Sequence, residues 1–193
     1  DKTHFEPIKN EDTMNDKLAN PKVVGYAAIF ITGWMYSMYN AGWFMQQYPQ
    51  SDLITGLILG GIVVAIVGIF SFFRGETYEM SLFLGLGAFF FIASMVSMYA
   101  TGNSGPSANE GWLDVVWAVY FFYIWLGVMK KDVVVNLFLL GLWLTFLALA
   151  IGNWTMALFL VYVAGYLGLI TALLAGWLSA RNIITVETQT AEA

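Results

Sequence analysis

The sequence predicts an all-α integral membrane protein, built as a six-transmembrane-helix bundle with its N and C termini on the cytoplasmic side. Only 11% of the 193 residues are charged and 59% are hydrophobic, whereas a soluble domain is usually about one quarter charged. The uncharged runs are long and do not alternate between polar and apolar residues, which favours helices over a β-barrel. We therefore expect a multi-pass protein of the plasma or inner membrane.

The first three predicted helices lie in three uncharged runs. The run between Lys22 and Asp52 has 29 residues, and the run between Asp52 and Arg74 has 21. The third run, between Glu79 and Glu110, has 30 residues. Each is long enough to cross the hydrocarbon layer, which takes about 20 helical residues. These helices are expected at residues 23–46, 53–73 and 80–99.

The last three helices are less evenly spaced. The run between Asp114 and Lys130 has only 15 residues, so the fourth helix must begin before Asp114, which we expect in the outer interface. The run between Asp132 and Arg181 has 48 residues, too many for one span. The polar segment Gly152-Asn153-Trp154-Thr155 divides it into two. These helices are expected at residues 112–129, 133–151 and 156–179.

The basic residues predict the orientation. Six spans place residues 1–22, a polar cytoplasmic tail, on the same side as a second cytoplasmic tail at 181–193, with the transmembrane domain at 23–180 between them. All eight Lys and Arg residues fall on that side: Lys2, Lys9, Lys17, Lys22, Arg74, Lys130, Lys131 and Arg181. By the positive-inside rule this side faces the cytoplasm.

The polar inventory excludes several function classes. The chain has no cysteine, its only histidine is His4, and the predicted apolar cores contain no ionisable residue. A haem, a metal site, a retinal Schiff base or a hydrolytic triad therefore lacks its residues, so we expect no cofactor, no metal and no enzymatic activity. A net charge of −5 with few basic residues argues against nucleic acid as a partner.

The remaining polar groups in the spans are neutral. Tyr36, Tyr39 and Asn40 share one face of the first predicted helix, where they either line a pore or hold helices together. Small residues recur at packing intervals in the first helix and in the sixth: Gly33, Ser37 and Ala41, then Ala164, Gly168, Ala172 and Gly176. Such residues let helices approach closely. From these residues we expect a channel or carrier for a small solute that is neutral or carries its own proton.

Several segments resemble the acetate uptake transporter family, the succinate–acetate permeases of bacteria, archaea and fungi. These segments are Asn20-Pro21 with Gly25, Asn40-Ala41-Gly42-Trp43-Phe44, Gly75-Glu76-Thr77-Tyr78 with Phe89-Phe90, and Gly152-Asn153. The resemblance lies in the order and spacing of these segments over about residues 17–180. The resemblance implies a six-helix protomer, a homohexamer in the lipid bilayer, and passage of acetate and related short-chain monocarboxylates, succinate included, by channel or proton symport.

The resemblance also implies a substrate pathway. The family's constriction of Phe, Tyr and Leu falls at Ile29, Leu86 and Leu142, so that only Leu142 keeps its residue type. These residues equally fit a plain hydrophobic core. Asn20 and Pro21 are candidates for the inner mouth, although the same pair would serve simply to start a helix. The candidates for lining the pore are Tyr36, Tyr39 and Asn40.

Two other functions stay open from the sequence. One is a channel of the same fold for another small solute, such as an alcohol, an amide or ammonia, because an all-aliphatic constriction offers a carboxylate no hydrogen bond. The other is a structural subunit of a larger membrane complex, because small-residue ladders and an aromatic surface also serve helix docking.

Overall fold

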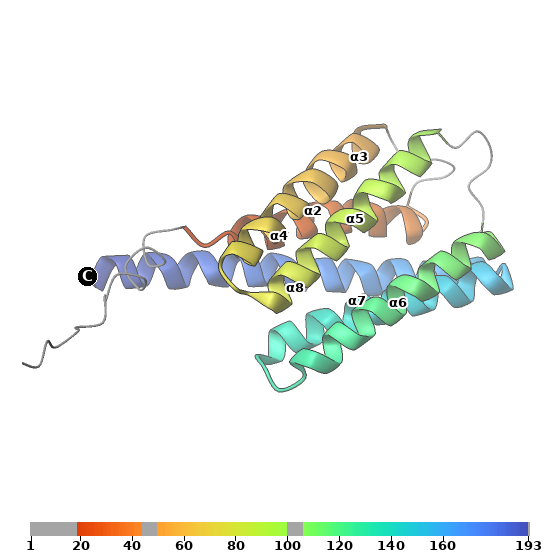
Figure 1. The fold of residues 1–193 in the computed structure, drawn as a ribbon. Coiled ribbons are helices and arrows are strands. Elements are labelled where there is room, and N and C mark those ends of the chain that lie inside the picture. The colour runs from red at the N-terminus through yellow and green to blue at the C-terminus, as the bar shows by residue number, and fades with distance from the viewer. Residues whose placement is uncertain (1–18, 44–49, 100–105, 193) are drawn as a thin grey trace, which may run out of the picture.

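The computed structural model describes residues 19–43, 50–99 and 106–192, with side chains to residue 185. These residues form helices and no strands. The elements are α2 (Lys22–Asn40), α3 (Gln50–Thr55), η1 (Gly56–Val63), α4 (Val64–Phe73), α5 (Thr77–Tyr99), α6 (Ala108–Val128), α7 (Val133–Thr155) and α8 (Leu158–Glu192). Figure 1 shows α3, η1 and α4 as one continuous rod beside α5.

The prediction of an all-α integral membrane protein is confirmed in its coarser form. Five helices of the described chain are long and apolar enough to cross a bilayer: Gln50–Phe73, Thr77–Tyr99, Ala108–Val128, Val133–Thr155 and Leu158–Thr185. Helix α2 is not among them, because its aromatic and small polar residues lower its apolarity. Six spans and the side of the termini therefore stay predictions.

The ends of two helices differ from the expected boundaries. Helix α2 ends at Asn40 rather than at residue 46, because Gly42 turns the backbone into the left-handed region at φ 79°; residues 44–46 lie outside the described chain. Helix α8 continues past the last predicted span, through the segment expected as the C-terminal tail, to Glu192. The apolar run predicts where a span ends in the membrane, but it does not predict where the helix ends. No Gly or Pro follows Ser179, so nothing in the segment after it breaks the helix.

Helices α2 and α8 pack closely against each other, and most of the small residues that the sequence singled out lie at this contact, together with Gly165, which it did not. The backbone of Gly165 lies against Ala41, and Gly168 lies against Ser37. A Cβ atom added at Gly33 would meet the Cβ of Ala172 at 3.7 Å. Near the start of α2, Ser179 donates a hydrogen bond to the carbonyl of Val23 at 2.8 Å. The seam therefore runs the length of α2.

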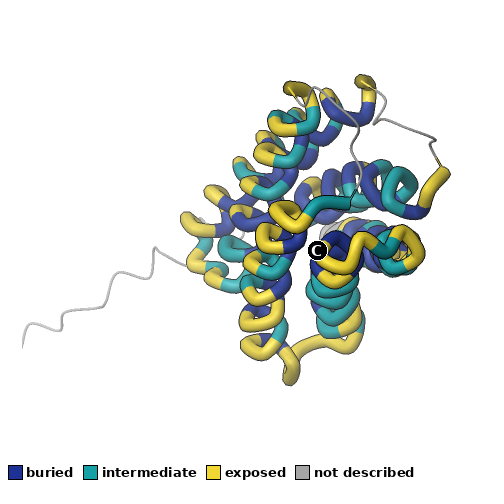
Figure 2. Tube along the Cα trace, turned by 90° about the vertical axis from the view of Figure 1, so that its right-hand side faces the viewer, coloured by how far each residue is buried: buried dark blue, intermediate teal, exposed yellow. Residues whose placement is uncertain are grey.

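The other helices assemble around this pair. The α3–η1–α4 rod packs on α5, α6 packs on α7, and α7 also packs on α8. In Figure 2, the buried stretches of the tube lie on the sides of the helices that face one another, and the exposed stretches lie on the outside. The rod approaches α2 and α5 at its glycines: a Cβ atom at Gly56 would lie 2.5 Å from the Ser94 hydroxyl, and one at Gly60 would lie 2.6 Å from Thr32.

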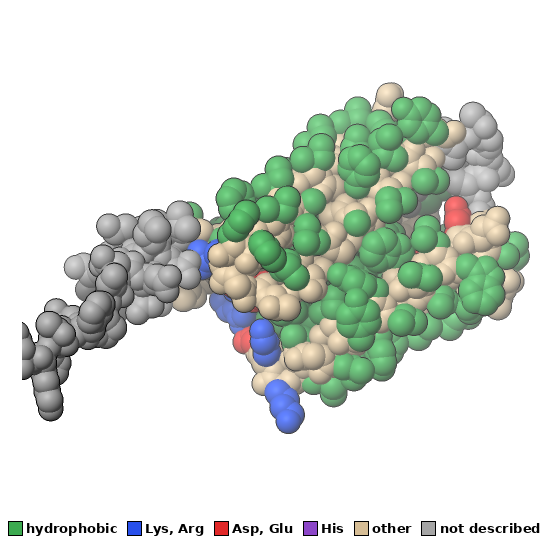
Figure 3. Space-filling model, in the orientation of Figure 1, with side chains coloured by type: hydrophobic (Ala, Val, Ile, Leu, Met, Phe, Trp, Pro, Cys, Tyr) green, Lys and Arg blue, Asp and Glu red, His purple; other side chains and the backbone are tan. Residues whose placement is uncertain are grey.

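The described basic residues gather at one end of the bundle. Figure 3 shows Lys and Arg side chains at the end that carries the α4–α5 and α6–α7 connections. They are Lys22, Arg74, Lys130, Lys131 and Arg181; Lys2, Lys9 and Lys17 lie outside the described chain. We refer to this end as the basic end.

A polar pair ties α7 to α8 at the basic end. The Asp132 carboxylate accepts the backbone N–H groups of Val134 and Val135, which caps α7, and accepts Arg181 Nη1 at 2.8 Å. The bond from Arg181 holds the pKa of Asp132 below its usual range. Because both side chains are exposed, the pair sets the register of the two helix ends more than it stabilises the fold.

The α2–α8 seam can be tested by enlarging one glycine. Gly168→Leu would drive a branched side chain into Ser37, and overpacking of this kind costs about 1–3 kcal/mol. We expect a lower thermal unfolding temperature in detergent. The matched control is Gly127→Leu on α6, where an added Cβ meets nothing within 4 Å. Equal stability of the two variants would contradict the seam.

Candidate functional site

The three residues predicted to form the constriction lie together in the bundle interior. Ile29, Leu86 and Leu142 come from α2, α5 and α7, belong to one hydrophobic cluster, and are at most 8% exposed. None carries a polar side-chain atom, so this level of the bundle is aliphatic. The structure thus brings the three predicted residues into one core. Their part as the narrowest point of a path stays a prediction.

An aromatic layer lies one helical turn closer to the basic end. Tyr26 precedes Ile29 by three residues, and Phe83 and Phe138 hold the corresponding places on α5 and α7. The Tyr26 ring meets Phe83 edge-on at 5.2 Å between centroids and Phe138 at 5.8 Å. Phe83 and Phe138 are fully buried. The sequence analysis missed this layer, although an aromatic residue one turn before each predicted constriction residue was a readable signal.

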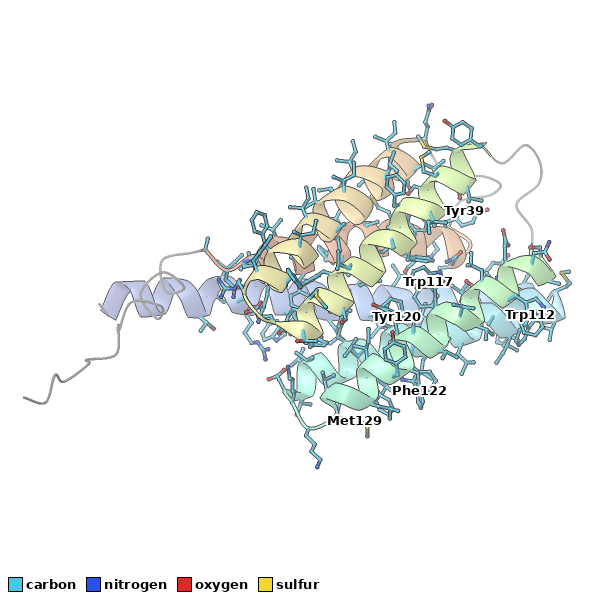
Figure 4. All side chains as sticks on the ribbon, viewed as in Figure 1. Tyr39, Trp112, Trp117, Tyr120, Phe122 and Met129 are labelled. Carbon is cyan, nitrogen blue, oxygen red and sulfur yellow. The ribbon has the colours of Figure 1, made fainter. Side chains whose placement is uncertain are left out.

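A second aromatic layer lies on the other side of the aliphatic residues. Phe90 and Phe146 each follow the constriction residue of their helix by four positions. Phe89 joins them, with its ring 5.3 Å from Phe90 and 4.8 Å from Phe146. Trp117 on α6 closes the layer from the side at 5.5 Å from Phe89. Figure 4 shows Trp117 and Tyr120 on the side of α6 that faces α5. The aliphatic residues are thus enclosed between two aromatic layers.

The pore-lining candidates Tyr36, Tyr39 and Asn40 lie near the end of α2 that is opposite the basic end. Tyr36 is buried, and its hydroxyl shares a 2.7 Å hydrogen bond with Ser94, which joins α2 to α5. Its ring lies 5.6 Å from that of Phe90 between centroids, so Tyr36 belongs to the second aromatic layer. Tyr39 and Asn40 lie at the far end of α2, where the backbone of Gly165 packs against Asn40.

Asn20 and Pro21 lie at the opposite end, at the start of α2. The Asn20 side chain accepts the backbone N–H of Lys22 at 3.1 Å, and Pro21 directly precedes the helix. This is the helix-starting arrangement that the sequence left open for the pair. Their place at the basic end is compatible with an inner mouth as well.

A pocket of about 630 Å³ opens at the basic end, between the α4–α5 and α6–α7 hairpins. Charged and aromatic side chains from both hairpins and from α2 line it, chiefly Lys22, Glu76, Tyr78, Glu79, Tyr123 and Lys131. Sequence reasoning did not find this pocket, because its walls come from three separate segments of the chain.

Ion pairs organise one wall of the pocket. Lys22 Nζ lies 2.9 Å from Glu79 and 3.1 Å from Glu76, and Arg74 Nε lies 3.4 Å from the same Glu76 oxygen. The pairs join the start of α2 to the turn before α5, where Gly75 takes a positive φ of 71°. Two carboxylates and two cations are balanced here.

The pocket adjoins the first aromatic layer, that of Tyr26, Phe83 and Phe138. Tyr78 lines the pocket, and its hydroxyl lies 3.4 Å from the hydroxyl of Tyr26. Lys131 Nζ lies above the Tyr78 ring, 4.8 Å from its centroid. From the basic end inward, the chain therefore presents a charged pocket, a pair of phenols, an aromatic layer and an aliphatic layer.

A buried polar pair lies at the other end of the bundle. Asp114, which the sequence predicts in the outer interface, lies in the second turn of α6, and its side chain is 9% exposed. The amide of Asn153 on α7 donates to it at 2.7 Å. The segment that separates two predicted spans therefore also supplies the partner of a buried carboxyl group.

The described side chains offer little other chemistry. No group of three or more His, Cys, Asp or Glu residues in the described ranges could hold a metal ion. Asp52 is buried near the start of α3, where Ser51 donates to it at 3.1 Å. The Oγ1 atom of Thr32 is buried without a hydrogen-bond partner in the described chain. The arrangement fits passage of a small solute.

Comparison with known proteins places this fold. The model of the GPR1/FUN34/yaaH family matches residues 2–191. The chain is 25% identical over 173 residues to the succinate-acetate/proton symporter SatP of Escherichia coli (strain K12), which covers 88% of this chain and 91% of that protein. The ammonia transport outward protein 2 of Saccharomyces cerevisiae is 26% identical over 177 residues, covering 88% of this chain and 63% of that protein.

A solved structure gives the same fold. The structure of the bacterial acetate channel SatP aligns with a TM-score of 0.81 at 24% identity, covering 89% of this chain and 95% of that one. The family match and these relatives confirm the resemblance that the sequence motifs indicated. They also place the chain among multi-pass membrane transporters and channels.

The Asp114–Asn153 pair predicts a non-additive pattern of stability. Asn153→Leu leaves a buried carboxyl group without its donor, which costs about 1–3 kcal/mol. Asp114→Leu leaves the amide unpaired with a similar cost. The double variant removes both polar groups, so we expect it to be more stable than the sum of the single losses. Unfolding of all four proteins in detergent measures this, and strictly additive losses would contradict the pairing.

Proposed function

Because the chain belongs to the GPR1/FUN34/yaaH family, we propose that it carries acetate and related short-chain monocarboxylates across the membrane, passively or with a proton. The observation that carries the proposal is the uncharged series of layers on α2, α5 and α7, from Tyr26 through Ile29 to Phe90. The E. coli relative is named for succinate as well as acetate, so succinate is included.

The chemistry of these layers favours a neutral permeant. Moving a bare anion through an apolar wall costs several kcal/mol unless polar groups replace its water. An acid that enters with its own proton is neutral and avoids this cost. Apolar constrictions also gate by excluding water. Ile29, Leu86 and Leu142 are proposed as that constriction, and the flanking aromatic layers are proposed to close it from both sides.

The proposed topology has six membrane spans, with both termini in the cytoplasm. Helix α2 is the first of these spans and is added to the five helices that are apolar enough by themselves. The proposed domains are the tail at 1–22, the transmembrane domain at 23–180, and a cytoplasmic extension from residue 181. The gathering of Lys22, Arg74 and Lys131 at the basic end supports it, since positive charge marks the cytoplasmic side. A homohexamer with one path in each protomer is part of the proposal, by resemblance to the family.

A second candidate substrate is ammonia. One observation favours it: the yeast relatives are named as ammonia transport outward proteins, and the aliphatic layer here has no polar side chain that distinguishes an acid from another small neutral solute. Swelling of proteoliposomes against a panel of solutes separates these two candidates.

The leading proposal is tested by flux. Purified protein in liposomes should take up labelled acetate faster than protein-free liposomes, and an inward proton gradient should increase uptake if the acid enters protonated. Uptake no faster than in protein-free liposomes at any pH from about 5 to 7, which spans the acid's partly protonated range, would contradict the function.

The constriction predicts a blocked variant. Leu86→Trp adds a large ring at the level of the aliphatic layer, so we expect acetate uptake to fall to the rate of protein-free liposomes. The matched control is Ile92→Trp on the same helix, which is 46% exposed and should keep normal uptake. Gel filtration of both variants shows that they remain assembled. Normal uptake by a well-folded Leu86→Trp would remove Leu86 from the constriction.

A further inference from the structure

The pocket at the basic end lies on the surface of the bundle, ahead of the apolar layers. It lies between two hairpins, and its volume of about 630 Å³ is far larger than a two-carbon acid. Shape alone therefore selects nothing, and selectivity must come from the polar groups that line the walls. Those groups are charged side chains and the phenol of Tyr78, whose hydroxyl lies 3.4 Å from that of Tyr26.

One charged group of the pocket wall has no ion-pair partner among the described residues. Glu76 and Glu79 are both within 3.1 Å of Lys22, and Arg74 also contacts Glu76, so these four groups balance one another. Lys131 has no carboxylate within 4.0 Å among the described residues, and its ammonium rests on the face of Tyr78. With Arg74 counted beside the pocket wall, this group of charges has one excess positive charge, at Lys131, which favours an anion.

The phenols add a hydrogen-bond donor beside that charge. Tyr26 and Tyr78 share one contact of 3.4 Å between their hydroxyls. Two hydroxyls carry two protons, and a bond between them uses one. The second proton has no acceptor in the described part of the chain. An acceptor ligand beside Tyr78 would take this proton and contact the Lys131 ammonium as well.

We propose that this pocket is a binding site for the carboxylate group of a small monocarboxylate, held by the ammonium of Lys131 and the hydroxyl of Tyr78 in front of the Tyr26–Phe83–Phe138 layer. The inference rests on the proposed function and adds a site to it. The site gathers the anion at the basic end, and the acid enters the apolar layers only when it is protonated. Lys22 keeps its carboxylate partners and holds the wall.

Binding is tested without transport. The probe is 4-fluorobenzoate, whose ring is too large for the closed layers, and binding to the detergent-solubilised full chain is followed by broadening of its fluorine NMR line. We expect acetate to compete and the uncharged 4-fluorobenzamide not to bind. Lys131→Gln and Tyr78→Phe should each weaken binding about fivefold, as expected for one partly exposed charge contact or one hydrogen bond. Lys130→Gln is the matched control, because Lys130 is exposed and does not line the pocket.

The outcomes separate the site from the function. Probe binding that is equal in wild type and Lys131→Gln, or equal for the acid and the amide, would overturn the site. If the probe also blocks acetate flux from the basic side, and Lys131→Gln relieves the block, the site lies on the path. A protein that binds the probe as expected but moves no acetate would overturn the proposed function and leave the site standing. Because Lys131 is exposed, its substitution leaves the fold intact even if Tyr78→Phe does not.

Discussion

The close approach of α2 and α8 is the contact on which the rest of the structure depends. Helices in a bilayer gain no hydrophobic driving force from meeting one another, so they associate where small residues let their backbones touch. Gly165 and Gly168 provide that contact against Ala41 and Ser37. With one face held by α8, α2 is left with its other face toward the α3–η1–α4 rod, α5 and the buried cluster. The first and last helices thus meet side by side, and the two hairpins are arranged around them.

This arrangement explains why the interior is layered. Helices α2, α5 and α7 all begin at the basic end, so equivalent positions on the three helices lie at similar depths. Residues of one type at equivalent positions on the three helices therefore form a layer across the bundle. Tyr26, Phe83 and Phe138 make such a layer, and the proposed constriction follows it. Each layer is complete only because three helices contribute to it.

Polar groups in the interior are few, and most of those described are paired. Tyr36 bonds Ser94, and Asn153 bonds Asp114. An unpaired group in hydrocarbon would cost several kcal/mol. The charged groups of the pocket lie at the basic end, where water reaches them. A solute that enters from the basic end therefore meets polar groups first and apolar layers next. This order suits a small acid that binds a proton, and so becomes neutral, before it crosses.

The sequence alone determined the class of the protein and much of its layout. Its charge-free runs located the helices to within a few residues, except at Asn40 and beyond Ser179, because the hydrocarbon core imposes a minimum apolar length. Its motifs indicated the family, and through the family the candidates Ile29, Leu86 and Leu142. These signals are local, since each is read within one segment of the chain.

Only the tertiary structure decided which segments meet. The partners of Asp114, Tyr26 and Lys131 lie 39, 52 and 53 positions away in the chain, so nothing in the local sequence identifies them. The small residues of the first and last helices were visible in the sequence, yet their pairing with each other was not, because a row of small residues does not identify the helix that packs against it. The pocket and the layers depend on that pairing. Which side chains lie at the same level of the bundle is set by how helices that are distant in sequence pack together, because the composition of one helix does not fix its neighbours.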